Sequence, residues 1–164
     1  MHLRPSLAAG CLLLLLAACV GELEPGSVAP ADIPDPTTLA RTGRPNDWLI
    51  CPAEACEADA SAAAPSYPVA PGELLAAWRA VLAEQPRATV IAVDEPRGLV
   101  MAQDRTPVLR FVDTVTVRVL PTVGGGATFA AYSRSEIGYG DLGTNRRRLD
   151  AWTAEVGQRL RGRR

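Results

Sequence analysis

The sequence contains no lysine and a single histidine, His2, and these two shortages exclude most familiar catalytic centres. Without a histidine in the body of the chain, neither a Ser-His-Asp nor a Cys-His arrangement can form, and imidazole metal ligands are missing. Without lysine there is no Schiff-base nucleophile. The side chains that could still act in catalysis are carboxylates, hydroxyls, thiols and arginine. The sequence therefore predicts no metal site and no cofactor, and it favours a protein that is not an enzyme.

Aromatic residues are also scarce, at 5% of 164 residues, while 48% are hydrophobic. One small domain with a core of Val, Leu, Ile and Ala is expected, together with additional segments. Charge is uneven: residues 19–96 hold four arginines against twelve acids, whereas residues 97–164 hold twelve arginines against six. A basic half can face anionic headgroups or nucleic acid. The export signal described next argues against nucleic acid as a partner.

Residues 1–18 resemble a lipoprotein signal peptide. Arg4 supplies the positive start, and the apolar run over residues 7–16 has the length of a signal-peptide core but is too short to span a bilayer. The run ends in Ala17-Ala18-Cys19, which resembles a bacterial lipobox, so we expect a lipid anchor on Cys19. The alternative is ordinary cleavage that leaves Cys19 as a plain thiol. Val20, in place of the aspartate typical of inner-membrane retention, favours the periplasmic face of the outer membrane.

Residues 19–45 contain five prolines and show no hydrophobic periodicity, which predicts a disordered tether between the membrane and a single α+β domain over residues 46–164. Near the start of that domain, Cys51 and Cys56 lie five residues apart. In an exported protein this spacing indicates a local disulfide. A metal site would need more ligands than two thiols, and a redox pair usually has two residues between its cysteines.

Hydrophobic patterns predict two helices and four or five strands. Residues 71–84 form a helix with one apolar stripe, and a last helix runs from Leu142 onward with a second stripe. The predicted strands cover residues 66–69, 88–93, 99–103, 108–120 and 127–135. Short turns between successive strands indicate an antiparallel sheet. The predicted fold is therefore α+β, with a curved antiparallel sheet of four to five strands packed by an N-terminal helix and a long C-terminal helix, a layout similar to small lipid-carrier folds.

Two charged features conflict with their local surroundings. Asp113 interrupts an alternating apolar face of its strand, where an unpaired carboxylate is costly. Arg146, Arg147 and Arg148 occupy the first turn of the last helix, where the helix dipole favours acids. Asp113, Glu136, Asp141 or an external anion would relieve this conflict.

Three glycines, Gly138, Gly140 and Gly143, precede that helix and indicate unusual dihedral angles in the connection. Backbone amides at a helix start beside arginines are typical of an anion cradle. The Gly-Lys-Ser/Thr of a P-loop is absent, and no parallel βαβ unit supports a dinucleotide site.

The run Gly138-Tyr139-Gly140-Asp141 continues through Gly143 and Asn145 to the three arginines, and an upstream Arg110-Phe111-Val112-Asp113 element accompanies it. With these two motifs the chain resembles the family of proteins with domain of unknown function 1499. The resemblance extends from about Asn46 to Leu160. It implies no biochemical activity.

Four functional hypotheses remain open. The preferred one is a lipid-anchored envelope module that binds a lipid or small anionic molecule between sheet and helix. The alternatives are an envelope assembly or scaffold protein, a purely structural Arg/Asp network that pins the last helix to the sheet, and an enzyme with Asp113 or Asp141 as base. The candidate ligand-binding residues are Arg110, Asp113, Arg134, Tyr139, Asp141, Asn145, Arg146 and Arg148.

Overall fold

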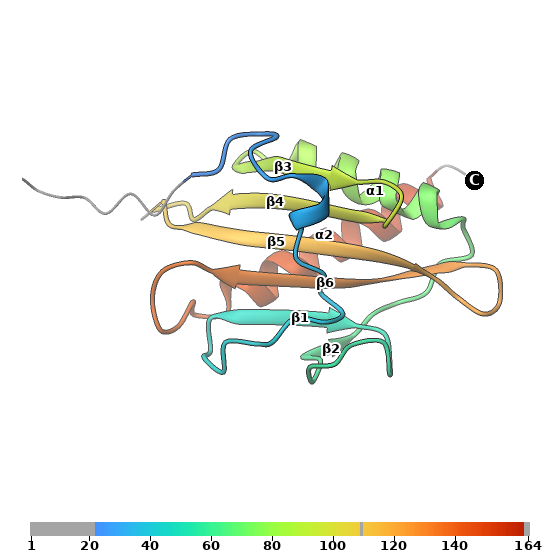
Figure 1. Ribbon diagram of the computed structural model, residues 1–164, viewed down its shortest axis with the longest axis horizontal. Coiled ribbons are helices and arrows are strands. Elements are labelled where there is room, and N and C mark those ends of the chain that lie inside the picture. The colour runs from blue at the N-terminus through green and yellow to red at the C-terminus, as the bar shows by residue number, and fades with distance from the viewer. Residues whose placement is uncertain (1–21, 109, 163–164) are drawn as a thin grey trace, which may run out of the picture.

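The computed structural model describes residues 22–108 and 110–162, in which six strands form one mixed sheet in the order β2-β1-β6-β5-β4-β3 (Figure 1). The short β2 runs parallel to β1, and all other neighbours are antiparallel. The strands are β1 Asp47–Cys51, β2 Ala62–Ala63, β3 Ala88–Asp94, β4 Leu99–Arg105, β5 Val112–Pro121 and β6 Ala127–Ser135. The predicted signal peptide and the lipid attachment at Cys19 lie outside the described residues.

Helices α1 (Pro71–Glu84) and α2 (Thr144–Arg161) lie together against one face of this sheet (Figure 1). Both predicted apolar stripes are buried, and the core forms between them and the sheet. Trp78 of α1 meets Phe129 of β6 edge to face, with ring centroids 4.8 Å apart. The helix side of the core contains Leu74, Leu75, Trp78, Val81, Leu82, Leu149, Trp152, Val156 and Leu160.

The α+β class is confirmed, but the sheet differs from the predicted one in three respects. Residues 47–51 and 62–63 add two strands at one edge, and their parallel pairing makes the sheet mixed rather than antiparallel. Residues 66–69 are not a strand, since only a single bridge joins Tyr67 to Ala127. The long strand starts at Val112 instead of residue 108, because Arg110 has a positive φ of 53° that an extended strand does not allow.

The last helix likewise begins at Thr144, two residues later than predicted. Leu142 and Gly143 have φ values of 54° and 76°, which lie outside the right-handed helical region. Gly138 has a φ of 97°, so the expectation of unusual dihedrals in this glycine-rich connection is confirmed for Gly138 and Gly143.

Residues 22–45 are not the free tether that the sequence predicts. They cross the face of the sheet opposite the helices, where Ile33 is 3% exposed and packs with Ala92, Leu99 and Met101. The amide of Gly26 donates to the carbonyl of Ile91 at 2.7 Å. The sequence did not indicate this contact. An irregular segment can pack on a sheet through a few isolated apolar side chains, and such side chains show no periodicity.

The predicted disulfide between Cys51 and Cys56 is present, with its Cα atoms 6.4 Å apart. It closes the loop that follows β1. No helix within the described residues has the length and apolar character needed to cross a membrane.

Candidate functional site

A row of polar side chains crosses the helix-covered face of the sheet at one end. Asp104 of β4 is directly opposite Asp113 of β5, and Asp113 is opposite Ser135 of β6. All three are buried, with Asp113 at 0% exposure. Two carboxylates facing each other across a strand pair repel, so this row needs a shared cation.

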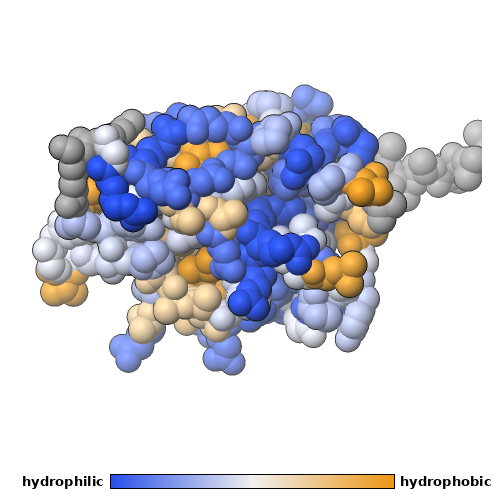
Figure 2. All heavy atoms as spheres, turned by 180° about the vertical axis from the view of Figure 1, so that it is seen from behind, coloured by the Kyte–Doolittle hydropathy of each residue, from blue (hydrophilic) through white to orange (hydrophobic). Residues whose placement is uncertain are grey.

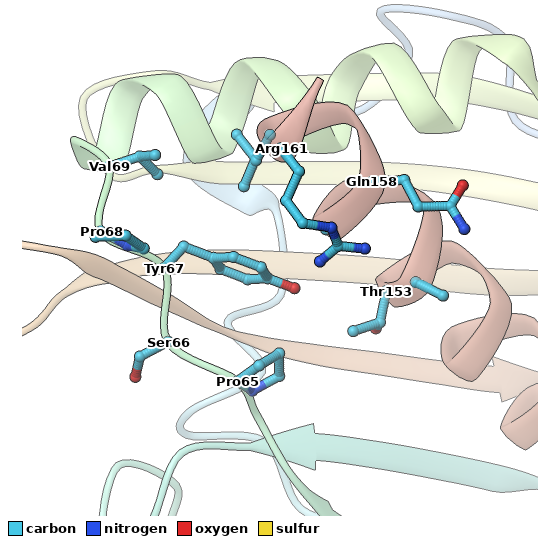
Figure 3. A pocket seen from close by; sticks show the side chains of 11 residues that line it. Pro65, Ser66, Tyr67, Pro68, Val69, Thr153, Gln158 and Arg161 are labelled. Atoms are coloured by element: carbon cyan, nitrogen blue, oxygen red, sulfur yellow. The ribbon is translucent and has the colours of Figure 1, made fainter. Parts of the chain in front are cut away.

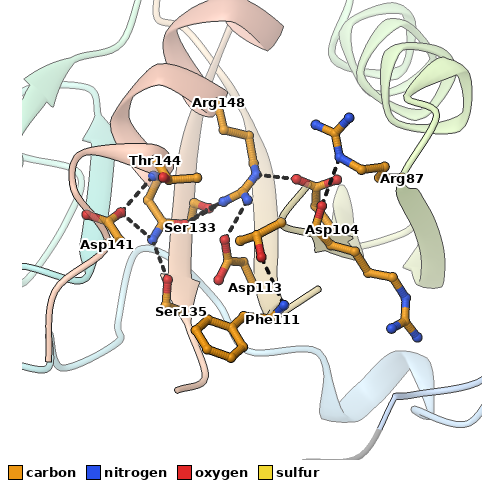
Figure 4. Close-up of polar contacts among 12 residues, drawn as sticks. Arg87, Asp104, Phe111, Asp113, Ser133, Ser135, Asp141, Thr144 and Arg148 are labelled. Carbon is orange, nitrogen blue, oxygen red and sulfur yellow. Dashed lines mark hydrogen bonds and ion pairs between the residues drawn. The ribbon is translucent and has the colours of Figure 1, made fainter. Parts of the chain in front are cut away.

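Arg148 of α2 supplies that cation (Figure 4). Its Nε donates to Oδ2 of Asp104 at 2.9 Å, and its Nη2 donates to Oδ2 of Asp113 at 2.5 Å. Nη1 donates to Ser133 Oγ at 3.0 Å and to Asn145 Oδ1 at 2.6 Å. The Arg148 side chain is 4% exposed, so the protein's own groups occupy its hydrogen-bonding capacity.

Asn145 and Asp141 connect this row to the start of α2. Asn145 is fully buried, and its Nδ2 donates to the carbonyl of Asn46 at 2.9 Å and to Asp141 Oδ2 at 2.7 Å. Asp141 also accepts hydrogen bonds from the amides of Gly143 and Asn145, at 2.8 and 2.7 Å. The Asp141 carboxylate therefore provides the negative charge that the helix dipole favours at its N-terminus.

The other two arginines of the triplet point elsewhere. Arg146 lies over the Trp48 ring, 5.2 Å from its centroid, and approaches the half-exposed Asp150 at 3.5 Å. Arg147 donates to the carbonyl of Leu142 at 2.8 Å. The sequence predicted that three arginines at the start of α2 would conflict with the helix dipole. Each arginine has its own partners, and carboxylates of the protein itself pair with Arg146 and Arg148.

Three further candidates lie outside the network. Arg134 pairs with Glu136 at 2.9 Å on the opposite face of the sheet. Tyr139 is 73% exposed in the connection between β6 and α2, and Arg110 is exposed between β4 and β5. Asp113, Asp141, Asn145 and Arg148 are therefore the four candidate residues that the structure brings together.

One atom of this network is unsatisfied. Oδ1 of Asp113 is buried and accepts no hydrogen bond of regular geometry among the described residues, although the neighbouring Ser135 hydroxyl stabilises the charged form of the carboxyl. Burial raises the pKa of the Asp113 carboxyl above its ordinary value, and the neighbouring Arg148 and Ser135 offset this only in part. An orphaned buried oxygen is unusual and costly, and it is a natural acceptor for a donor group from outside the chain.

Asp113 and Ser135 line a pocket of about 340 Å³ at this end of the sheet. The remaining walls come from the β4–β5 connection and the β6–α2 connection, and they are largely apolar. The apolar side chains are those of Pro107, Val108, Phe111, Ile137 and Leu142, while Asp141 adds a second carboxylate. None of the candidate arginines lines this pocket.

A larger cavity of about 490 Å³ lies between residues 65–69 and the C-terminal half of α2 (Figure 3). Tyr67 and Arg161 project into it, and burial raises the pKa of the Tyr67 hydroxyl. Thr153 Oγ1 lacks a hydrogen-bond partner among the described residues. This cavity is separate from the motifs that the sequence analysis singled out.

Sequence reasoning missed Asp104, Ser133 and Ser135, although a signal was present. Val100, Ala102 and Asp104 alternate onto the helix-facing side of β4, and Ala131, Ser133 and Ser135 do so on β6. The stripe of α2, extended back from Leu149 and Trp152 by four residues each, reaches Asn145 and Arg148. Extending the alternating patterns of β4 and β6 and the helical stripe of α2 to their polar residues would have located the polar network.

Comparison with known proteins shows the family of the chain and a distant likeness to solved structures. No curated protein sequence matches the chain. Among solved structures, the crystal structure of Ara h 8.0201 aligns with a TM-score of 0.42 and 8% sequence identity, covering 60% of this chain and 95% of that one. The family model described as protein of unknown function (DUF1499) matches residues 30–156, which include both motifs and part of the segment predicted as a tether. The chain therefore belongs to the DUF1499 family.

Proposed function

We propose that this protein is a membrane-anchored binding module, not an enzyme, and that it holds an amphipathic molecule in the pocket formed by Phe111, Ile137 and Leu142. The observation that carries the proposal is the buried Asp113, whose Oδ1 lacks a hydrogen bond of regular geometry, in the lining of a pocket with largely apolar walls. Ligand pockets typically combine apolar walls with a few polar groups that fix orientation. This pocket has that composition.

The carboxyl group of Asp113 determines which ligand head groups the pocket can bind. A carboxylate oxygen accepts hydrogen bonds and attracts positive charge, so it favours an ammonium or hydroxyl group over an anion. Asp141 adds negative charge to the same lining. Arg148 is occupied by Asp104 and Asp113 and offers little to an anion. We therefore favour a lipid-like molecule with a donor head, and the small anionic ligand considered from the sequence is not proposed.

The proposed test uses the full chain in lipid nanodiscs and a pair of photoactivatable probes that share one eight-carbon tail. One probe carries a primary amine and the other a carboxylic acid. A charge-assisted hydrogen bond contributes about 1.5–3 kcal/mol, which corresponds to a preference of about tenfold or more for the amine. Peptide mapping after irradiation is expected to place the amine crosslinks on Phe111, Ile137 or Leu142.

A matched pair of variants gives the control. Ile137→Trp fills the pocket and is expected to abolish amine labelling, whereas Val123→Trp, at an exposed turn between β5 and β6, leaves it unchanged. The proposal fails if the acid labels the pocket as strongly as the amine, or if Ile137→Trp labels like the wild-type chain.

A further inference from the structure

We infer that the end of the domain that carries the pocket docks directly on a membrane surface. This end, called the loop end below, consists of residues 106–108 and 110–111 between β4 and β5 and residues 136–143 between β6 and α2. The inference goes beyond ligand binding and does not depend on it, but it does use the expected membrane anchor at Cys19.

Exposed apolar side chains gather at the loop end. Val108 and Leu142 are 86% and 94% exposed, and the aromatic ring of Tyr139 is 73% exposed. Phe111 and Ile137 are each 37% exposed. Figure 2 shows apolar atoms at this end of the molecule, next to the place where the described chain begins. Among the described residues, Val123 is the one other large apolar side chain with such exposure, and it lies in the β5–β6 turn at the far end.

The described chain begins beside the loop end (Figure 1). The amide of Leu23 donates to Gln103 Oε1 at 2.9 Å, and Glu22 forms an ion pair with Arg105. Arg105 is the last residue of β4 and pairs with Val112, the first residue of β5, so these contacts lie at the base of the β4–β5 connection. The packing of residues 22–33 on the sheet keeps this starting point in place.

The reach of the intervening chain is short. Two residues separate Cys19 from Glu22, and three Cα steps span at most about 11 Å. A lipid on Cys19 would therefore hold Glu22, at the base of the β4–β5 connection, within about 11 Å of the lipidated residue and would keep the loop end close to the bilayer. This reverses the expectation that a long tether keeps the domain away from the membrane.

The composition of the loop end suits a bilayer interface. Apolar loop tips can enter the headgroup region, and tyrosine is enriched at that depth in membrane proteins. Arg110 and Arg147 are exposed next to these tips and can face anionic headgroups. The acidic neighbours Glu136 and Asp141 are already paired, with Arg134 and with backbone amides respectively. The occupant we assign to this surface is thus an anionic lipid bilayer, and the pocket would open toward it.

The test measures how deeply two exposed positions sit relative to the bilayer. A solvatochromic amino acid replaces Leu142 in one full-length protein and Val123 in a matched control, and both are reconstituted in phosphatidylethanolamine–phosphatidylglycerol vesicles. Lipids with a nitroxide on the acyl chain quench labels that enter the bilayer. We expect the label at position 142 to be quenched at least about fivefold more strongly than the label at position 123, in line with its apolar exposure beside the anchor.

Equal quenching at the two positions, or stronger quenching at position 123, would overturn the inference. Adding Ile137→Trp to the protein labelled at 142 keeps this readout separate from ligand binding. That substitution fills the pocket but retains an apolar surface, so quenching is expected to persist even if the amine probe no longer binds. We also combine Tyr139→Asp and Val108→Asp in the protein labelled at position 142. This double substitution is expected to abolish quenching, and unchanged quenching would contradict the inference.

Discussion

Nη2 of Arg148 in α2 lies 2.5 Å from Oδ2 of Asp113 in β5, and both side chains are buried. This contact joins the last helix to the centre of the sheet. The same guanidinium also binds Asp104, so one cation pairs with both carboxylates that face each other across β4 and β5. Oδ2 of Asp113 binds Arg148, whereas Oδ1 accepts no hydrogen bond of regular geometry among the described residues.

Removing the cation should be strongly destabilising. We predict that Arg148→Met lowers the free energy of unfolding by about 3–5 kcal/mol, because it leaves Asp104 and Asp113 buried without a counterion. Chemical denaturation measures the change. Arg146→Met is the matched control, with an expected change below about 1 kcal/mol, since the Arg146 side chain is 63% exposed. Neutralising both acids together with Arg148 should recover part of the loss. A triple variant that is less stable than Arg148→Met alone would contradict this account.

The N-terminal segment gives a prediction that separates a packed segment from a free tether. Ile33→Ala should cost about 2 kcal/mol or more, because Ile33 is 3% exposed against Leu99 and Met101. Hydrogen exchange of the Gly26 amide, which is bonded to Ile91, should accelerate in the same variant. Val123→Ala, at a fully exposed position, should change neither quantity. A free tether would leave both stability and exchange unchanged in Ile33→Ala.

Acid should weaken the contact between this segment and β1 through Asp47. Burial alone would raise the pKa of the Asp47 carboxyl, but hydrogen bonds from Arg41, Tyr132 and Thr42 lower it below the ordinary value of 3.8. A carboxyl with a depressed pKa in the folded state stabilises the protein above pH 3.8, and this contribution is lost as the pH falls through the folded-state pKa.

The free energy of unfolding should therefore fall below about pH 4, and Asp47→Asn should make that fall shallower. Asp150→Asn is the matched control, because the Asp150 side chain is 52% exposed. We expect it to change the fall of the unfolding free energy with pH less than Asp47→Asn does. The pKa of Asp113 is raised, so this carboxyl lowers the free energy of unfolding as the pH rises above 3.8. Measurements below pH 3.8 therefore isolate the effect of Asp47. Identical slopes for wild type and Asp47→Asn would refute the role of Asp47.

The elements that follow from local chemistry could be predicted from the sequence. The apolar stripe of α1 located the helix to its last residue, Glu84, and the spacing of Cys51 and Cys56 located the disulfide. The interruption of an apolar strand face by Asp113 correctly indicated a buried carboxylate in need of an arginine. Each of these features depends on residues close together in the chain, where helix and strand periodicity determine which side chains share a face.

Tertiary structure alone decided the rest. Arg146 and Arg148 have the same chemistry, yet successive helical residues differ by about 100° in direction. Only Arg148 therefore reaches the buried carboxylates of β4 and β5, while Arg146 lies over the Trp48 ring of β1. Whether residues 22–45 would be free or packed depended on an apolar patch around Leu99 and Met101 that belongs to a distant part of the chain. Local periodicity specifies faces within one element, whereas the pairing of those faces depends on which elements the fold places side by side.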